Sequence, residues 1–466
     1  MPRKSIGIVD IGSNSVRLMI YDGDKSLPML LFNEKAACAL GQGIMGSGKL
    51  NPKGVPLALA ALKRFAELGS AFKVDVLDVM ATAAVRDAKD GPAFVAEAER
   101  NCGVRINILS GEREAKLAAL GIQAGTLNSK GIAADLGGGS LDLVTLKPND
   151  FGEFASLPLG LQRLGEISDN NSEKAGEIVD KALANFVWLK AAQGENLYVM
   201  GGAWRALAKV LMIAINYPLN VLDNFTLNKN QAINLCEEVS RLTPKFLEKI
   251  NYISKKRLAG LPLAALLLEK LLKASLAKEV VFSAHGLREG RFLELTQHVA
   301  RYPDPLLNAA WELAKERARF PAAGSELLEF IRPLMTKITL PSRIFEAAAL
   351  MADSFWTEHP EYRAEKALGG ILHSSLMGMD HKTRAHLALI LYFRHNGKDD
   401  NPILNSVLGL ISFAELRHLQ ALGLALRIGL TISGGAPSLL NKYSLKQAPP
   451  SLDLGKAVEK LDKLLI

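Results

Sequence analysis

Cysteine is scarce in this 466-residue sequence. The three cysteines, Cys38, Cys102 and Cys236, are far apart, and none belongs to a C-x-x-C pair. An odd number of isolated thiols is typical of a reducing compartment. It supports neither a disulfide scaffold nor a cysteine-rich zinc site.

Long hydrophobic runs are also missing. The longest apolar stretches, such as Val210–Leu222 and Leu261–Leu268, are too short or too interrupted to span a bilayer, which takes about 20 apolar residues. The opening residues, MPRKSIGIVDIG, contain no apolar stretch of about 7–15 residues followed by a small-residue cleavage site. We therefore expect a cytoplasmic protein without a membrane partner.

The sequence has no basic tail. Its net charge is +8, of which residues 301–466 contribute +3 (20 basic against 17 acidic) and the other 300 residues +5 (36 against 31). This excess favours a polyanionic partner such as nucleic acid, polyphosphate or a nucleotide, but a solvated surface explains it equally well. With 48% hydrophobic residues, the composition excludes a disordered chain or a fibre. At about 150 residues per domain, the length predicts about three domains.

One pattern occurs twice. Residues 5–22 alternate apolar runs with a turn (SIGIVDI, GSNS, VRLMIYD), which predicts a β-hairpin, and residues 131–146 repeat the pattern (GIAADL, GGGS, LDLVTL). The matching aspartates, Asp10 and Asp135, are 125 residues apart. This spacing is the length of one domain and indicates an internal duplication.

After each hairpin, strand and helix patterns alternate, which favours an α/β fold with covered sheets. The expected helices are Pro52–Leu68, Pro92–Asn101 and Ala175–Ala191, and the expected strands are Val74–Met80, Val104–Leu109, Leu197–Met200 and Glu279–Ser283. From Pro303 onward the patterns are helical and amphipathic, which predicts a separate all-α domain.

The two repeated turns have the composition of phosphate-binding loops. Glycines let the backbone approach a ligand and expose consecutive N–H groups to phosphate oxygens, while carboxylates suit Mg²⁺ held partly through water. Two ordinary hairpins are the alternative, but two copies with matching aspartates favour the functional interpretation. The candidate phosphate-binding residues are Gly12, Ser13, Asn14, Ser15, Arg17, Gly137, Gly138, Gly139 and Ser140, and the candidate Mg²⁺ ligands are Asp10, Asp135 and Asp142.

Five motifs stand in order along the chain: DIGSNSVR, ATAAVRDA at 81–88, ILSGEREA at 108–115, DLGGGSLD at 135–142 and GLREG at 286–290. They resemble those of the exopolyphosphatase/guanosine-pentaphosphate phosphatase family, within the superfamily of acetate and sugar kinases, actin and heat-shock chaperones. The resemblance implies an α/β fold of two duplicated ribonuclease-H-like domains, residues 1–127 and 128–300. An all-α domain related to HD-type metal phosphohydrolases, residues 301–466, would follow.

The resemblance also implies catalytic roles for two residues. Arg86 would face the cleft and bind phosphate through its guanidinium group, although an exposed arginine at a helix start is the alternative. Glu114 would be the general base that orients and deprotonates the attacking water, with an ordinary pKa near ~4.3 that keeps it ionised at neutral pH. Acidic residues also favour helix N-termini for purely structural reasons, and Glu112 is the weaker candidate.

Further positions match the family pattern less decisively. Gly160 and Arg163 are possible substrate contacts, and Gly201 with Gly202 matches a glycine pair that meets adenosine in nucleotide-binding relatives. Tight packing at helix starts would explain these residues equally well. A basic groove for a polyanion would use residues such as Lys255, Lys256, Arg257 and Arg288, although such clusters are usually solvated surface.

The sequence departs from the family pattern at several positions. Asp142 stands where glutamate is usual, Leu141 where threonine is usual and Ala259 where aspartate is common. In the C-terminal region, Asp380–His381 has the reverse order of an HD pair, and Asp353 lacks a preceding histidine. We therefore expect an HD-like scaffold without metal, which extends a polyanion groove or dimerises.

The expected activity is that of a Mg²⁺-dependent exopolyphosphatase, which releases orthophosphate from the end of inorganic polyphosphate. Hydrolysis of the 5′-phosphate of guanosine pentaphosphate is the alternative within the family. An ATP-dependent small-molecule kinase, or a sensor that binds polyphosphate or guanosine tetraphosphate without turnover, are alternatives of other classes. A homodimer is expected and a nucleic-acid partner is not.

Overall fold

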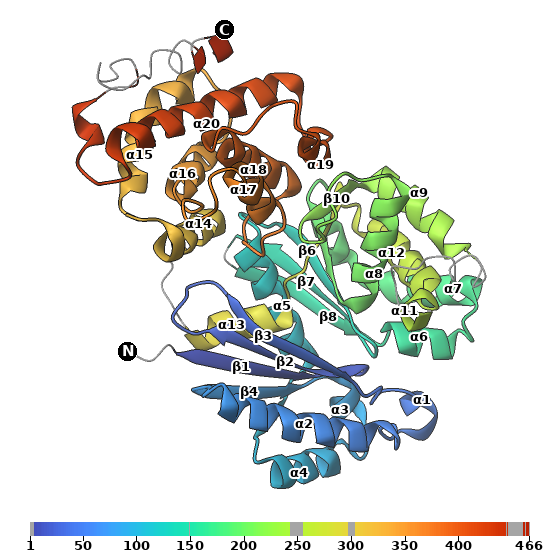
Figure 1. Ribbon diagram of the computed structural model, residues 1–466. Coiled ribbons are helices and arrows are strands. Elements are labelled where there is room, and N and C mark those ends of the chain that lie inside the picture. Colours follow the sequence, from blue (N-terminus) through green and yellow to red (C-terminus); the bar gives the residue numbers. More distant parts are fainter. Residues whose placement is uncertain are drawn as a thin grey trace. The chain divides into compact units, whose positions relative to one another are not determined.

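The computed structural model describes residues 4–148, 150–242, 255–296, 303–443, 445, 460–461 and 463–465. The chain forms two compact units, which are Met1–Asn216 with Leu222–Val299, and Tyr217–Val221 with Ala300–Ile466 (Figure 1). The first unit contains two β-sheets. The expected boundaries at residues 127/128 and 300/301 stay predictions, and residue 300 lies outside the described part.

The first sheet has five strands in the order β3-β2-β1-β4-β5. Its strands are β1 (Ser5–Ile11), β2 (Ser15–Asp22), β3 (Leu30–Ala37), β4 (Val76–Ala81) and β5 (Ile106–Ile108). The three strands β1, β2 and β3 pair antiparallel, whereas β1, β4 and β5 pair parallel. The predicted first hairpin is therefore present as β1 and β2.

The second sheet has six strands in the order β10-β11-β9-β6-β7-β8. Its strands are β6 (Gly131–Leu136), β7 (Leu141–Lys147), β8 (Asp150–Leu157), β9 (Asn196–Met200), β10 (Phe225–Asn228) and β11 (Glu279–Phe282). Here β6, β7 and β8 pair antiparallel, and β6, β9 and β11 pair parallel. Five strands thus repeat the order and directions of the first sheet, which confirms the duplication; β10 is an addition at the edge.

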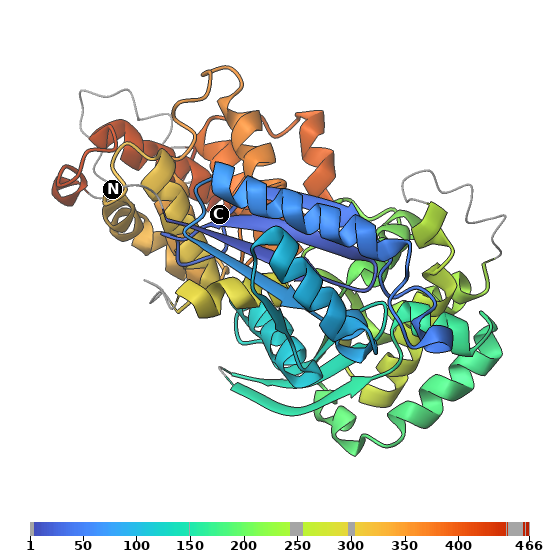
Figure 2. The same cartoon turned by 90° about the horizontal axis from the view of Figure 1, so that it is seen from below.

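Helices cover both faces of the first sheet. On one face, α2 (Gly54–Ala71) and α4 (Gly91–Cys102) pack in one hydrophobic cluster with apolar side chains of β1, β2 and β4 (Figures 1 and 2). On the other, Leu117 of α5 (Gly111–Gly125) joins Leu287 and Phe292 of α13 (Leu287–Thr296). Helix α13 therefore packs on the first sheet, although it follows the last strand of the second in sequence.

Helix α5 also packs on the second sheet, through Ala115, Ala118, Ala119 and Ile122. The other helices of this half are α6 (Leu161–Ile167), α7 (Ser172–Leu183), α8 (Gly202–Ala214), α9 (Lys229–Ser240), α11 (Lys255–Leu258) and α12 (Leu261–Ser275), and the short helix α3 (Ala83–Asp87) follows β4. The predicted helix Ala175–Ala191 is wrong in extent, because α7 ends at Leu183 and Val187–Ala192 forms a 3₁₀ helix. The side chain of Asn185 donates to the Lys181 carbonyl, a local bond that competes with helix continuation.

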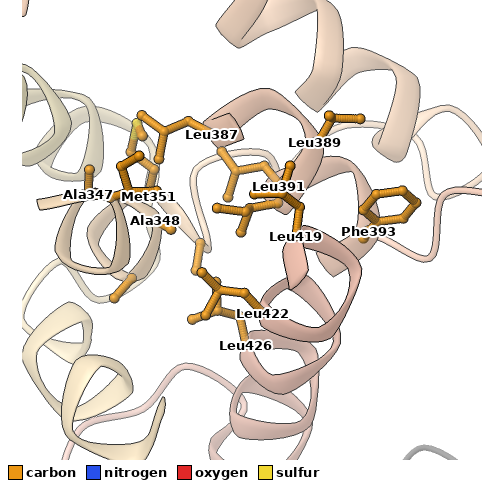
Figure 3. Close-up of a cluster of buried hydrophobic side chains, with 14 of the residues drawn as sticks. Ala347, Ala348, Met351, Leu387, Leu389, Leu391, Phe393, Leu419, Leu422 and Leu426 are labelled. Atoms are coloured by element: carbon orange, nitrogen blue, oxygen red, sulfur yellow. The ribbon is translucent and has the colours of Figure 1, made fainter. Parts of the chain in front are cut away.

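Every element in the described residues after Pro303 is helical, which confirms the all-α expectation. The helices are α14 (Pro305–Arg317), α15 (Ala323–Ile331), α16 (Ser342–Met351), α17 (Arg363–Leu372), α18 (His381–Arg394), α19 (Asn405–Leu408) and α20 (Phe413–Ser433), joined by short 3₁₀ turns. Alanines of α16 let it pack closely against the leucines of α18 and α20 in the core that Figure 3 shows. None of the described helices is by itself long and apolar enough to cross a bilayer; Pro402–Leu408 and Phe413–Ser433 pass that test only when joined across a 118° bend.

Candidate active site

The two glycine-rich turns have the same backbone geometry. In the β1–β2 turn, the N–H of Gly12 donates to the carbonyl of Ser15 over 3.0 Å, and in the β6–β7 turn the N–H of Gly137 donates to the carbonyl of Ser140 over 3.0 Å. The strand register places Asp10 opposite Arg17 in the first hairpin and Asp135 opposite Asp142 in the second. The structure therefore brings the predicted aspartates to equivalent strand ends.

These two turns lie in contact within the first unit. A Cβ at position 138 would be 2.9 Å from the Cβ of Ser13, so the approach requires glycine at this position. Both loops line a cavity of about 10 Å³, which is room for about one water molecule. Next to it, the N–H of Gly43 donates to Glu166 Oε1 over 3.3 Å. A phosphate group is larger than a water molecule, so this cavity by itself does not hold one.

The first loop is held by the segment that follows β3. The carbonyl of Asn14 accepts hydrogen bonds from the N–H groups of Cys38 and Ala39, at 3.2 and 3.0 Å, and the carbonyl of Ser13 accepts one from Gly41 at 2.8 Å. Asn14 Oδ1 is buried without a hydrogen-bond partner in the described structure. The loop is thus fixed by backbone contacts, which leaves its side chains for other interactions.

Glu114 and Arg86 form an ion pair beside the second loop. Ser110 caps α5 by accepting a hydrogen bond from the N–H of Arg113, which places Glu114 in the first turn of the helix. Glu114 Oε2 is 3.1 Å from Arg86 Nη1, which also donates to the carbonyl of Leu109 over 3.0 Å. Arg86 is the next-to-last residue of α3, directly after β4, so elements distant in sequence build the pair.

The expectation of an ordinary pKa for Glu114 is wrong. Burial raises the pKa of its carboxyl well above the usual range, and the neighbouring carboxylates of Asp142 and Asp135 raise it further, against the opposing effect of Arg86. The exposed Glu112, by contrast, pairs with Lys116 over 2.7 Å on the outer face of the same helix. Of the two candidate bases, therefore, only Glu114 lies next to Arg86 and the buried aspartates, whereas Glu112 faces solvent.

Asp142 is held by hydroxyl groups. Its two oxygens accept hydrogen bonds from Ser140 Oγ at 2.8 Å and Ser156 Oγ at 2.5 Å. Burial raises the pKa of Asp142, while these two hydrogen bonds oppose the rise. Ser156 belongs to β8, a strand that the sequence analysis did not anticipate.

Asp10 and Asp135 lie among arginines. Asp10 Oδ2 is 3.6 Å from Arg288 Nη1, and burial raises its pKa against the effects of Arg288 and Arg17. Burial together with the charge of Asp142 raises the pKa of Asp135 to about 7. The negative charge of these carboxylates is thus incompletely compensated by the protein.

The carboxylates of Asp10 and Asp135 fit Mg²⁺. In phosphate-processing sites this ion is usually bound by one or two carboxylates together with water and phosphate oxygens. No three His, Cys, Asp or Glu side chains in the described residues are grouped so as to hold a metal ion by themselves. Binding of Mg²⁺ by Asp10, Asp135 and Asp142 would therefore need further ligands such as water or phosphate oxygens. The role of Asp142 as a Mg²⁺ ligand stays a prediction.

Three arginines near Asp10, namely Arg17, Arg205 and Arg288, belong to a cationic cluster. Burial lowers the pKa of Lys35, and four arginines of the cluster lower it further; burial and Arg288 likewise lower the pKa of Arg205 to about 10. Arg17 donates from Nε to Asn33 Oδ1 over 2.7 Å, so β3 orients it. The cluster consists of Arg17, Lys35, Arg205, Arg257 and Arg288.

The sequence analysis named Arg17, Arg257 and Arg288 as candidates but missed Lys35 and Arg205. Arg205 follows the Gly201–Gly202 pair by one helical turn, a position from which α8 can aim it at the strand ends. Lys35 is opposite Arg17 in the strand register, which becomes visible only once β3 is known. The side chains of Lys255 and Lys256 lie outside the described part.

A buried contact positions Arg288. Its neighbour Glu289 accepts hydrogen bonds from Tyr21 Oη and from the N–H of Gly286, both at 2.9 Å. Although burial alone would raise the pKa of Glu289, Arg288, His285 and these hydrogen bonds lower it. The ionised carboxylate thus ties the start of α13 to β2.

Two weaker candidates, Arg163 and Gly160, have structural roles. Arg163 donates to Asp87 Oδ2 over 2.9 Å, and Asp87 also pairs with Arg86, so these groups connect the two halves of the unit. A Cβ at position 160 would lie 2.3 Å from the backbone of Gly139 and Ser140, which explains Gly160 by packing.

The aspartates of the HD-like region also have structural roles. Asp380 caps α18 by accepting a hydrogen bond from the N–H of Thr383 over 2.6 Å. Asp353 binds Arg319 through two side-chain hydrogen bonds of 2.9 and 2.7 Å. Both carboxylates are therefore committed to holding helices and loops in place.

The sequence matches two family models and is similar to several known proteins. Residues 19–298 match the model of the Ppx/GppA phosphatase family, and residues 306–455 match the model described as exopolyphosphatase, C-terminal. Exopolyphosphatase 1 of Mycobacterium tuberculosis is 26% identical over 300 residues, which cover 62% of this chain and 87% of that protein. Retrograde regulation protein 2 of Saccharomyces cerevisiae is 25% identical over 445 residues, covering 85% of this chain and 73% of that protein.

The fold agrees with solved structures. The crystal structure of the Aquifex aeolicus Ppx/GppA family member matches with a TM-score of 0.55 and 23% identity, covering 64% of this chain and 98% of that chain. An exopolyphosphatase structure from Cytophaga hutchinsonii matches with a TM-score of 0.56 and 22% identity, covering 63% of this chain and 98% of that chain. With family models matched on both sides of residue 300 and the duplicated sheets in place, this chain belongs to the Ppx/GppA phosphatase family.

Proposed function

We propose that this protein is an exopolyphosphatase that hydrolyses the terminal phosphoanhydride bond of inorganic polyphosphate with the help of Mg²⁺. Relatives named exopolyphosphatase support the substrate class. The observation that carries the proposal is the Glu114–Arg86 pair, in which Glu114 is buried close to Asp135 and Asp142 of the second glycine-rich hairpin. A carboxylate and a guanidinium group are thereby available to one phosphate group.

Each part of the site has a role in this reaction. The N–H groups of the two loops bind the terminal phosphate, and Arg86 offsets the charge that develops on its oxygens. Glu114 orients a water molecule and takes its proton as the water oxygen bonds to the terminal phosphorus. The bridging P–O bond breaks, orthophosphate leaves, and the chain departs one phosphate shorter. Asp10 and Asp135 would hold Mg²⁺, which would supply positive charge to the phosphate oxygens.

The cationic cluster serves the remainder of the substrate. A linear polyphosphate has one negative charge or more on every unit, and the five cations of this cluster would provide charge-assisted hydrogen bonds to such a chain. Arginine suits this purpose because its planar guanidinium group binds two phosphate oxygens at once. The cluster thus favours a polyanion over a small neutral substrate.

Phosphate release by the purified full chain tests the proposal. Long-chain polyphosphate and guanosine pentaphosphate are compared with Mg²⁺ at equal terminal-phosphate concentration, for the wild type, Glu114→Gln and Glu112→Gln. Loss of a general base costs about 10²–10⁴-fold in rate. We expect this loss in Glu114→Gln and near-wild-type rates in Glu112→Gln, whose side chain lies on the exposed face of the same helix turn.

The outcomes separate the rival functions. Faster release from guanosine pentaphosphate would assign that nucleotide as the substrate of the same site. No release from either compound would contradict the proposal and favour a sensor; one of the similar proteins is named for regulation. Full activity of Glu114→Gln would refute the assigned base whichever substrate is preferred.

A further inference from the structure

The helical unit contains an open, polar pocket of about 220 Å³. One water molecule needs about 10–15 Å³ of such space, so the pocket can hold a polyatomic ion with several waters. Helices α17, α18 and α20 all contribute to its wall. The described residues that line it are Pro360, Arg363, Arg394, His395, Asn396, Arg427, Leu430 and Thr431, and no carboxylate is among them.

Three arginines converge on this pocket from three different helices. Arg363 donates from Nε and Nη2 to the carbonyl of Glu358, at 3.2 and 3.0 Å, and Arg427 Nη1 donates to Asn396 Oδ1. These acceptors are neutral, so they orient the guanidinium groups without cancelling their charge. The negative end of the helix dipole at the C-terminus of α18 favours a cation nearby, which explains Arg394. It does not explain why Arg363 and Arg427, which belong to other helices, line the same pocket.

One carboxylate lies close to the arginines, but it is already bound. Asp353 Oδ1 is 3.5 Å from Arg394 Nη2, and the same side chain accepts two shorter hydrogen bonds from Arg319. In the described structure two guanidinium groups, those of Arg319 and Arg394, therefore share this carboxylate. Burial lowers the pKa of Arg394 to about 10 even with Asp353 beside it, and Arg319, Arg363 and Arg427 act in the same direction.

His395 also lines this pocket, and its neutral ring has one N–H donor. Arg394 Nη1 lies 2.9 Å from His395 Nδ1, and because the guanidinium can only donate, Nδ1 is the acceptor and the ring proton is on Nε2. Burial and then Arg394, Arg363 and Arg427 lower the pKa of His395 to about 2, so the ring is neutral. Both His395 Nε2 and Arg394 Nε are buried without a hydrogen-bond partner in the described structure.

We propose that this pocket is a second anion-binding site, which takes one phosphate group. The residues around the pocket supply positive charge and more N–H donors than acceptors. A tetrahedral oxyanion supplies the missing negative charge and hydrogen-bond acceptors. The group can belong to free orthophosphate or to a unit of a polyphosphate chain. The site does not depend on the proposed catalytic function, since binding of orthophosphate requires no turnover.

Hydrogen exchange of the full chain, read by mass spectrometry, tests the proposal segment by segment. The probes are potassium phosphate, long-chain polyphosphate with Glu114→Gln to prevent its consumption, and potassium chloride at equal ionic strength. We expect slower exchange in peptides covering 391–398 and 424–433 with a phosphate probe and no change with chloride. Protection by orthophosphate alone assigns the free ion, and protection by polyphosphate alone assigns the chain; either result supports the site.

Substitutions at the rim locate the effect. Arg427→Gln, and independently Arg363→Gln, should raise the phosphate concentration for half-maximal protection by about tenfold, as expected for the loss of one charge-assisted hydrogen bond. Arg417→Gln on the same helix α20, whose side chain donates to the carbonyl of Lys463 away from the pocket lining, serves as the matched control. Absence of protection with both phosphate probes, or equal protection in all three variants, would overturn the proposal.

Discussion

The acid–base behaviour of Glu114 depends on its neighbours more than on its own chemistry. Burial disfavours its charged form, Asp142 and Asp135 add repulsion, and the hydrogen bond from Arg86 opposes both. A base with a raised pKa holds a proton at a pH where an ordinary glutamate is ionised. In the proposed mechanism, activity therefore needs Glu114 to lose that proton, which positive charge from Mg²⁺ and substrate-bound arginine favours.

We predict that phosphate release by the wild type falls as the pH drops through this raised pKa, well above the range of an ordinary carboxyl group. Asp142→Asn removes the carboxylate that most strongly raises the pKa of Glu114. The pKa should therefore fall, and the acidic limb of the pH–rate profile should move to lower pH. The measurement is the profile of kcat/KM with Mg²⁺ and polyphosphate in both proteins.

The position of the acidic limb of the pH–rate profile distinguishes a change in the pKa of Glu114 from a simple loss of rate. If Asp142 acts only through Mg²⁺, the substitution lowers the rate at every pH and leaves the limb in place. Asp169→Asn, which removes an exposed carboxylate that pairs only with Lys174 in the described structure, should leave both rate and limb unchanged. A limb that moves to higher pH in Asp142→Asn would contradict the electrostatic account.

At the scale of elements, the junction of β9 and α8 brings the backbone close to the catalytic strand ends. Gly201 has φ +106°, a conformation that L side chains rarely adopt, and a Cβ there would lie 2.3 Å from the carbonyl oxygen of Leu136 and 3.2 Å from Asp135 Oδ1. The next residue, Gly202, begins α8 and has no neighbour within 4 Å of such a Cβ. The two glycines of the motif thus face different constraints.

We predict opposite effects for two neighbouring substitutions at this junction. Gly201→Ala should destabilise the fold by at least about 1–3 kcal/mol, because it adds backbone strain as well as a steric clash with β6. Gly202→Ala should be neutral or stabilise by up to about 1 kcal/mol, because alanine favours the helix and has free space. Urea unfolding followed by circular dichroism compares them, and equal midpoints would show that the backbone at Gly201 relaxes.

The parts of the fold that the sequence predicted share one property, namely a buried periodic pattern. The hairpins at 5–22 and 131–146 are almost entirely buried, so their apolar residues reveal both strands and the duplication. Strands β3 and β8 were missed because they contain few buried residues and therefore no clear apolar run. Because β3 was missed, Lys35 was not predicted as part of the site. Because β8 was missed, the same holds for Ser156, which donates a hydrogen bond to Asp142. The raised pKa of Glu114 could not be predicted from the sequence either, because it is caused by burial against segments that are distant in the chain.

At the scale of the whole molecule, the chain passes between its two compact units more often than a simple order of domains requires. The short segment Tyr217–Val221, between α8 and β10, belongs to the helical unit, whereas the residues on either side belong to the first unit. Its Leu219 is 1% exposed in the core of the helical unit, and Tyr217 Oη is 2.9 Å from His381 Nδ1. A division of the chain at residue 300 would therefore remove part of the helical core.

We predict that Leu219→Ala destabilises the helical unit by about 2–5 kcal/mol, the usual cost of a cavity left by a buried leucine. The exposed neighbour Asn220→Ala, in the same segment, should change stability by no more than about 0.5 kcal/mol. Thermal unfolding of the full chain, with hydrogen exchange of peptides from α16, α18 and α20, locates the loss. Because the substitution does not touch the candidate active site, phosphate release at low temperature should stay at the wild-type level. Unchanged exchange in these helices would show that Tyr217–Val221 only rests on the helical core without stabilising it.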